Sequence, residues 1–314
     1  MPSTPASLLP QIGSRPGRAA GARRLALTVL AAGLLALACA RTEVRAADSV
    51  ALFTALAKPA LLPNRIEWGA AKATGPSSLV LSDVVVTLAP NPAWPQGVPV
   101  RIARVTIEDI DFEGLRRGDA PLRLRLTLNG ISASGRPAFL AALGPGPYRG
   151  SAALDYRVRA GEGLRVDRFL LDLSGLGRLE LALDLGGAAA LSGRLNAGSL
   201  DTVTMRSGRL VYEDRSLLAK AVAAEARRQN VKEKTVVTQW SLWLGLFAMR
   251  EGSEALPSLN ALLAFLQDYR SPHGALKISF NAPPDAPGGL PIADVLSAGI
   301  LRTLGAKVSY AGAN

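Results

Sequence analysis

The chain has 314 residues, enough for one large domain or two ordinary ones, and its 48% hydrophobic and 19% charged content indicates a globular rather than a disordered protein. Its net charge is +11, but residues 1–46 carry six arginines and one acid, and subtracting these from the 36 basic and 25 acidic residues leaves about +6. No lysine and arginine cluster is interleaved with aromatic residues, so the composition argues against a nucleic-acid partner. It suits, at most, association with an anionic membrane surface.

Residues 1–46 predict a Sec-type signal peptide. Four arginines between positions 15 and 24 precede a sixteen-residue apolar run, Leu25 to Ala40, and Val44 and Ala46 supply the small residues expected before a cleavage site. The run falls short of the ~20 residues that a spanning helix needs. We therefore expect cleavage after Ala46 and a periplasmic protein. A lipoprotein modified at Cys39 is the alternative, which the residues before the cysteine favour less.

From residue 47 onward the main pattern is alternation with a period of two, which predicts strands with one apolar face. It is clearest at residues 178–185, where charged or small residues alternate with Leu179, Leu181, Leu183 and Leu185. Comparable runs lie at 84–88, 105–107, 122–128, 154–158 and 169–173, and weaker ones at 191–195, 203–205 and 210–212. A change of phase near Asp109 predicts a bulge. Because the opposite faces are charged, burial on both sides is disfavoured, and we expect an antiparallel sheet.

Helical periodicity or capping signals mark five further segments. A helix over 49–57 should end before Pro59, and Asp214 should cap a helix over 215–229. Residues 238–249 and 253–269 have the apolar spacing of helices, and a helix over 292–304 should end at Gly305. Short strands at 276–280 and 308–310 complete the last third.

These segments predict an α+β fold: a large one-sided, mainly antiparallel sheet with amphipathic helices packed on it and a helix-rich C-terminal third. Residues 47–314 should form a single exported domain. Within it, residues 64–148 and 149–230 each contain several one-sided strands followed by a short helix, a similarity of pattern that fits a duplication. Residues 231–314 form the helical section.

The leucine face of such a sheet must be covered, because each fully buried leucine contributes about 1.5–3 kcal/mol that is lost in water. A second sheet, the chain's own helices or a lipid could provide the cover. We expect a non-enzymatic envelope protein that binds a lipid or another apolar ligand through the sheet, with Leu179, Leu181 and Leu183 as candidate contacts. The alternative is an interaction or scaffold protein, in contact with other envelope proteins, whose helices cover the sheet fully and which has no ligand.

The helix over 238–249 adds three candidate contacts, Trp240, Trp243 and Phe247. Aromatic residues at helical spacing usually belong to a core, but this helix has hardly a polar residue on any side. It should therefore be wholly buried or lie against lipid or a partner protein, and burial is the interpretation we prefer.

Residues for catalysis or metal binding are scarce. Cys39 is the only cysteine and leaves with the signal peptide, so the exported chain has no disulfide or thiolate site. His273 is the only histidine, in a Ser-Pro-His-Gly turn without metal ligands at suitable spacing. No Gly-x-Ser-x-Gly or phosphate-binding motif occurs, and Gly175-Leu176-Gly177 fits a hairpin turn. We expect no enzyme activity, metal or cofactor; a hydrolase would need a cleft that joins His273 to a serine and a carboxylate.

Two sequence motifs resemble those of proteobacterial envelope proteins. One is Leu-x-Val-Asp-x-Phe-x-Leu-Asp-Leu-Ser-Gly-Leu-Gly, here Leu164 to Gly177, and the other is Tyr-x-Asp-x-Ser-Leu-Leu, here Tyr212 to Leu218. Together with the signal peptide they are similar to the AsmA-like and DUF945-like periplasmic families, although AsmA-like proteins are usually longer and keep a membrane anchor. The resemblance implies envelope maintenance or lipid handling, with no catalytic residues.

Overall fold

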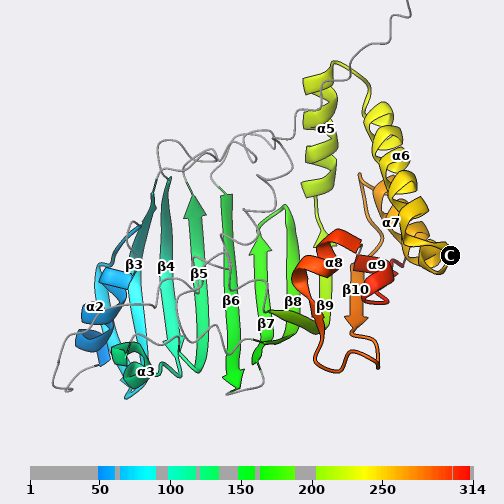
Figure 1. Cartoon of the computed structure of the whole chain (residues 1–314). Helices are drawn as coiled ribbons and strands as arrows, with labels where there is room; N and C mark the ends of the chain where they lie inside the picture. The colour runs from blue at the N-terminus through cyan, green and yellow to red at the C-terminus, as the bar shows by residue number, and fades with distance from the viewer. Residues whose placement is uncertain are drawn as a thin grey trace, which may run out of the picture. The chain divides into compact units, whose positions relative to one another are not determined.

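An open antiparallel sheet organises the computed structural model, which describes residues 49–60, 64–89, 98–117, 121–133, 148–159, 163–187, 203–298 and 300–311 (Figure 1). All of these residues belong to one unit, Ala36–Asn314. The predicted signal peptide, Cys39 and the weak run at 191–195 lie outside the described residues.

Twelve strands occur among the described residues, and all of them join this sheet. They are β1 (Arg65–Glu67), β2 (Ala70–Gly75), β3 (Ser78–Leu88), β4 (Val98–Glu108), β5 (Arg123–Ala133), β6 (Tyr148–Arg159), β7 (Gly163–Leu173), β8 (Gly177–Gly186), β9 (Thr204–Asp214), β10 (Leu276–Asn281), β11 (Leu290–Pro291) and β12 (Lys307–Ser309). Their order is β1-β3-β4-β5-β6-β7-β8-β9-β10-β12, with β2 also paired to β3 and β11 to β9. Every pairing is antiparallel, which confirms the predicted class of sheet.

The alternating leucines of β8 share one face of the sheet with apolar residues of the neighbouring strands. Leu181 lies opposite Phe169 of β7 and Leu210 of β9, and directly opposed residues in an antiparallel pair point to the same side. Parallel rows contain the pairs of Leu179 with Leu171 and of Leu183 with Val166. We call this side of β5–β9 the leucine face.

Small shifts of register keep the apolar residues on this face. In β7 the apolar positions change phase, from Leu164 and Val166 to Phe169 and Leu171, yet all pair with leucines of β8 because the register shifts between Val166 and Phe169. Shifts also occur between β5 and β6, β6 and β7, and β8 and β9. A β-bulge accommodates one extra residue in one strand. Without it, the strict alternation of side chains would place the following apolar residues on the opposite face of the sheet.

The opposite face of the sheet carries ion pairs between strands. Arg125 of β5 contacts Glu108 of β4 and Asp155 of β6, each at 3.3 Å. Arg157 and Arg165 both contact Asp167, and the hydrogen bond from Arg157 lowers the pKa of this carboxyl group. Such exposed pairs add little stability, but they keep this face solvated and so fix which side of the sheet needs a cover.

The described helices are α2 (Ser49–Ala60), α3 (Phe112–Arg117), α5 (Leu217–Gln229), α6 (Glu233–Glu251), η3 (Ser253–Ala255), α7 (Leu256–Gln267), α8 (Ile292–Ala298) and α9 (Ile300–Thr303). Figure 1 shows them at the two ends of the sheet. The helix α2 packs on β2 and β3 and contacts α3, while α7 packs on β10 and β12 and contacts α6, which in turn packs on α5. The predicted helix-rich last third is therefore confirmed.

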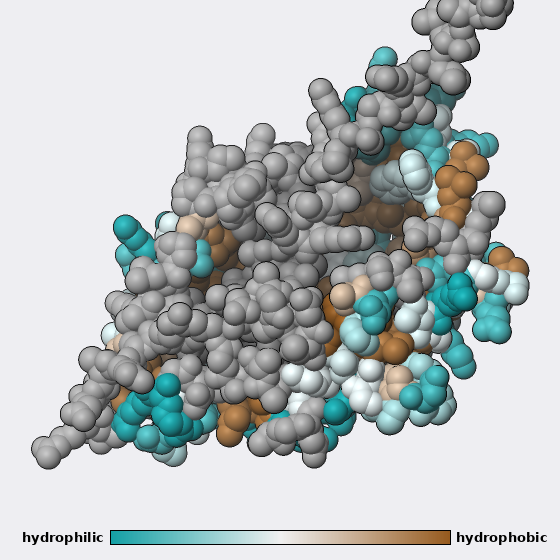
Figure 2. Space-filling view, viewed as in Figure 1, coloured by the Kyte–Doolittle hydropathy of each residue, from teal (hydrophilic) through white to brown (hydrophobic). Residues whose placement is uncertain are grey.

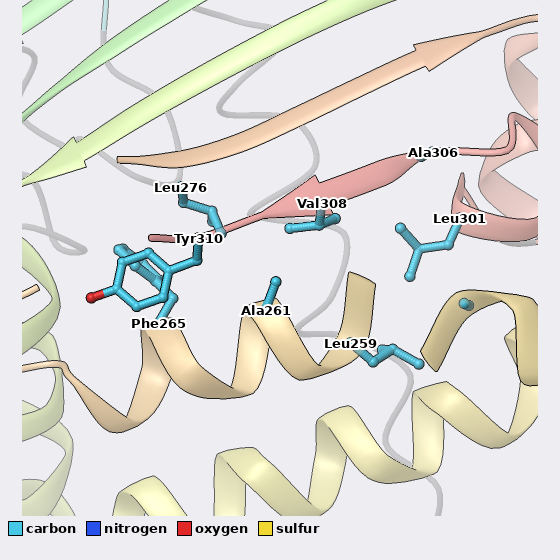
Figure 3. Packing of buried hydrophobic residues seen from close by; sticks show 9 residues of the cluster. Leu259, Ala261, Phe265, Leu276, Leu301, Ala306, Val308 and Tyr310 are labelled. Carbon is cyan, nitrogen blue, oxygen red and sulfur yellow. The ribbon is translucent and has the colours of Figure 1, made fainter. Parts of the chain in front are cut away.

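The helical end contains a core built between α7 and the last strands (Figure 3). Phe265 of α7 lies edge-on between two tyrosine rings, at centroid distances of 6.0 Å from Tyr212 and 5.3 Å from Tyr310. Leu259 and Ala261 of the same helix, with Leu276 and Val308, complete the contact. The amphipathic spacing predicted for residues 253–269 thus fastens the C-terminal strand to the sheet.

Two predictions of detail are wrong. The helix α2 continues through Pro59 to Ala60. The fixed φ of proline is compatible with a helix, and because Pro59 is the second-last residue of α2, its missing N–H removes only one hydrogen bond of the last turn. Asp109 does not bulge within a strand: β4 ends at Glu108, and Asp109 adopts φ 61°, which aspartate tolerates. Asp111 then accepts a hydrogen bond from the Gly114 N–H at 2.9 Å and so caps α3. The apolar spacing of this segment resembles that of a strand, so the sequence pattern did not indicate this N-cap.

Replacing Phe265 by alanine should lower the free energy of unfolding by about 3–5 kcal/mol, because it leaves a cavity between the rings of Tyr212 and Tyr310. Leu256→Ala on the same helix is the matched control: Leu256 is 51% exposed, and its loss should cost within about 0.5 kcal/mol. Denaturant titration followed by circular dichroism measures both. Equal effects of the two substitutions would contradict the core described for α7.

Candidate functional site

The leucine face is only partly shielded by the described residues. Leu79 and Leu81 of β3, beside α2, are fully buried, and Leu276 and Val308 at the helical end are buried. By contrast, Leu179, Leu181 and Leu183 are half-buried, as are most of their neighbours in β7 and β9. Among the described residues, no helix packs closely on β5, β6, β7 or β8. The three leucines proposed as contacts therefore lie together where the described helices do not reach.

Tyr156 of β6 marks the buried end of this face. Its side chain is 1% exposed, and it lies opposite Leu124 on one side and Val166 on the other. Burial raises the pKa of its hydroxyl group. Within the described residues this hydroxyl has no hydrogen-bond partner, although a buried hydroxyl nearly always has one. A polar atom from a ligand or a water molecule would satisfy it.

A second apolar surface lies on α6, and it overturns the preference for burial. Trp243 is 70% exposed and Phe247 39%, beside Leu242 at 65% and Leu246 at 56%. These four residues, spaced by one and four positions, occupy one side of the helix, and we call them the α6 patch. Figure 2 shows apolar surface over this helix. Trp240, the third predicted aromatic contact, packs instead against the small core between α5 and α6.

The two halves of α6 pack against different neighbours, because α6 is longer than α5. The helix α5 has 13 residues and α6 has 19, about 20 Å against 28 Å at the helical rise. Val222 and Ala226 of α5 bury Val236 near the start of α6. The second half of α6 packs against α7 and η3, and Trp243 and Phe247 lie on the side of α6 that the described helices leave exposed.

The two motifs that carry the family resemblance meet in one place. Asp172, in the first motif, accepts two hydrogen bonds from Arg215, in the second, at 2.7 and 3.2 Å. The hydroxyl of Ser216 donates to the carbonyl of Gly175 at 2.5 Å. Three successive N–H groups at residues 215–217 point at the carbonyl oxygen of Leu176, at 3.0–3.1 Å. We call these contacts the turn–helix junction.

Glycines and a capping carboxylate complete the turn–helix junction. Gly175 has φ 70°, as the β7–β8 hairpin turn requires, and a Cβ on Gly177 would lie 2.8 Å from the carbonyl oxygen of Glu213. Asp214 accepts hydrogen bonds from the Leu218 N–H at 2.9 Å and the Tyr212 hydroxyl at 2.6 Å, so it supplies a capping hydrogen bond to α5 from two residues before the N-cap, Ser216. Burial first, and this hydrogen bond second, raise the pKa of Tyr212. The motifs therefore anchor α5 to the sheet.

His273 is exposed beside a structural contact. Its ring lies 3.3 Å from the carboxylate of Asp268, which also accepts a hydrogen bond from the Tyr310 hydroxyl at 2.8 Å. The backbone N–H of His273 donates to the same hydroxyl. The group thus ties the C-terminal strand to the turn after α7, and the described contacts bring no serine to this histidine.

Two surface hollows formed by described residues have linings of mixed charge. One, of ≈ 940 Å³, lies beside the first turns of α6 and is lined by Lys232, Lys234, Glu233 and Arg270. The other, of ≈ 330 Å³, crosses β7–β10; its lining includes Leu183, but most of its residues point to the opposite face, among them Asp184 and Arg209. Most of the residues that line the two hollows are polar or charged. The described side chains bring no three histidine, cysteine or acidic residues together as a metal site would need.

A search for membrane-spanning helices within the described ranges finds none long and apolar enough. Residues 170–311, or 142 of the 314, match a family model described as "Uncharacterized protein". This segment runs from the second half of β7 to the end of the described chain and includes the turn–helix junction and the α6 patch. No curated protein matches the sequence. The likeness to AsmA-like and DUF945-like proteins stays a prediction.

Sequence reasoning found the residues of the turn–helix junction but not their contact. Asp172 and Arg215 are 43 positions apart, and no local pattern indicates that a hairpin turn meets a helix start. What the sequence did offer is that each of the two residues belongs to a motif that contains turn or capping residues. The exposure of Trp243 depends on which sides of α6 its neighbours α5 and α7 cover, and the periodicity of α6 alone does not give this.

The turn–helix junction should hold α5 and α6 in place more than it stabilises the sheet. We expect the double substitution R215Q/S216A to speed amide exchange over residues 217–251 roughly two- to tenfold, the range that one or two hydrogen bonds support. Hydrogen exchange with mass spectrometry measures it. R125Q is the control, since Arg125 pairs with Glu108 of β4 and Asp155 of β6, away from α5, and should change little there. Faster exchange confined to the strands would contradict this role.

Proposed function

We propose that this chain is a non-catalytic, exported envelope protein that binds a lipid against the leucine face. The observation that carries the proposal is the half-buried row of Leu179, Leu181 and Leu183, flanked by apolar rows of β7 and β9, where the described helices do not pack. The predicted signal peptide supports export. The resemblance to periplasmic families concerned with lipid handling points in the same direction.

The dimensions of the leucine face suit an acyl chain. Strands lie about 4.8 Å apart, so the five strands β5–β9 span roughly 19 Å. One leaflet of a bilayer contributes about half of the ~30 Å hydrocarbon core, so an acyl chain reaches about 15 Å. Such a chain can lie across several of the leucine rows. The Tyr156 hydroxyl, which has no hydrogen-bond partner among the described residues, offers a hydrogen bond on the same face.

Native mass spectrometry of the protein isolated from a bacterial envelope tests this function. We expect a fraction of the protein to carry a lipid, and L181N to reduce that fraction about tenfold or more, because an amide placed against hydrocarbon without a partner costs about 1–3 kcal/mol. A182N is the matched control: Ala182 is the next residue of β8 and points to the opposite face.

Folding of both variants is checked by circular dichroism and thermal unfolding. If the wild-type protein contains only ligand-free species, lipid binding is refuted and the scaffold alternative, with a sheet covered without a ligand, gains support. If A182N loses lipid as strongly as L181N, the leucine face is not the binding surface.

A further inference from the structure

The helical hairpin of α5 and α6 presents charge and apolar surface in a fixed order. Along one side of α6, at spacings of three or four residues, lie Lys232, Thr235, Gln239, Leu242 and Leu246. All but Gln239 are exposed, and Trp243 and Phe247 adjoin the last two. A cation therefore stands at the tip of the hairpin, and the exposed apolar residues follow further along the same side.

We propose that this side of the α5–α6 hairpin docks on an anionic lipid bilayer, with the α6 patch entering the headgroup–acyl boundary. Tryptophan and phenylalanine are favoured at that depth, where leucine side chains also leave water. The helix would lie on the surface rather than cross it. This inference does not rest on the ligand of the leucine face, which involves other residues.

The charge of the hairpin favours an anionic surface. Residues 217–251 contain six basic and three acidic residues, a net charge of +3. The acids are already engaged: Glu225 with Arg228, Glu233 with Arg270, and Glu251, which is buried and accepts a hydrogen bond from the Arg302 N–H. The surplus cations, including Arg227, Lys232 and Lys234, are exposed near the tip. Cations near an anionic membrane surface add attraction that ionic strength weakens.

The same charge argues against a second copy of the chain as the occupant of the α6 patch. A two-fold symmetric contact through this side would bring two hairpins of net charge +3 together, and like charges oppose each other. The composition of α6 also matters. The second half of α6 is apolar both on its exposed side and toward its neighbours, and exposed apolar surface of this kind is usually covered by a membrane or a partner.

Sedimentation with vesicles tests the proposal on the protein as isolated from the envelope. We expect binding to vesicles of phosphatidylglycerol and phosphatidylethanolamine, weaker binding to phosphatidylcholine vesicles, and a decrease at raised ionic strength. L242Q and L246Q should each weaken binding about tenfold, because each removes most of one buried leucine side chain from the acyl boundary. L122Q, the same change at an exposed leucine in the segment before β5, should have no effect.

Two further measurements separate the contributions. K232Q/K234Q should weaken binding to anionic vesicles only, whereas K72Q, at an exposed lysine of β2, should not. Brominated lipids should quench the tryptophan fluorescence of the wild type and quench W243F less. L181N should leave vesicle binding unchanged, so a failure of this inference is distinct from a failure of the proposed lipid ligand.

The inference is overturned if L242Q and L246Q bind anionic vesicles as the wild type does. It is equally overturned if these variants change the oligomeric state measured by light scattering while vesicle binding stays the same, since the α6 patch would then join copies of the chain. Capture of a protein partner that the same variants abolish, without any vesicle binding by the wild type, also overturns it.

Discussion

The structure depends on the need to cover one side of a wide sheet. One face of the sheet carries ion pairs, such as those of Arg125 with Glu108 and Asp155, and is solvated. The other face carries rows of leucine and requires an apolar environment. The described helices meet this need at the two ends, where α2 buries Leu79 and Leu81 and α7 buries Leu276. Between the two ends, the leucines of β8 are only half-buried, and the proposed ligand would remove their remaining apolar surface from water.

The turn–helix junction gives the two sequence motifs a structural meaning. In these motifs Asp172, Arg215 and Ser216 hold a hairpin turn against the start of α5. Their partners are one another and backbone carbonyls. The consequence is positional: the junction fixes where the α5–α6 hairpin leaves the sheet, and with it the placement of the α6 patch.

Much of the fold could be predicted from the sequence because a period of two reports directly on one-sided strands. The leucines at 179–185 lie in β8 as expected, and the capping role of Asp214 was readable from its position before a helix. Bulges were harder, since one inserted residue in β7 changes the phase without a local signal. The change of phase at Asp109 looked the same in the sequence, but there it marks the end of β4 and the start of α3. Only the partner strand distinguishes the two cases.

Register is where the leucine face and the turn–helix junction constrain each other. A slip of β8 by one residue relative to β9 would turn Leu179, Leu181 and Leu183 toward the charged face. It would also move Gly177 from its place opposite Asp214 and bring a side chain against the carbonyl of Glu213. Two unrelated penalties, one from the loss of apolar burial and one from a steric clash, therefore oppose the same error. Agreement of this kind between local and long-range contacts is what lets a repetitive, leucine-rich sequence specify a single pairing.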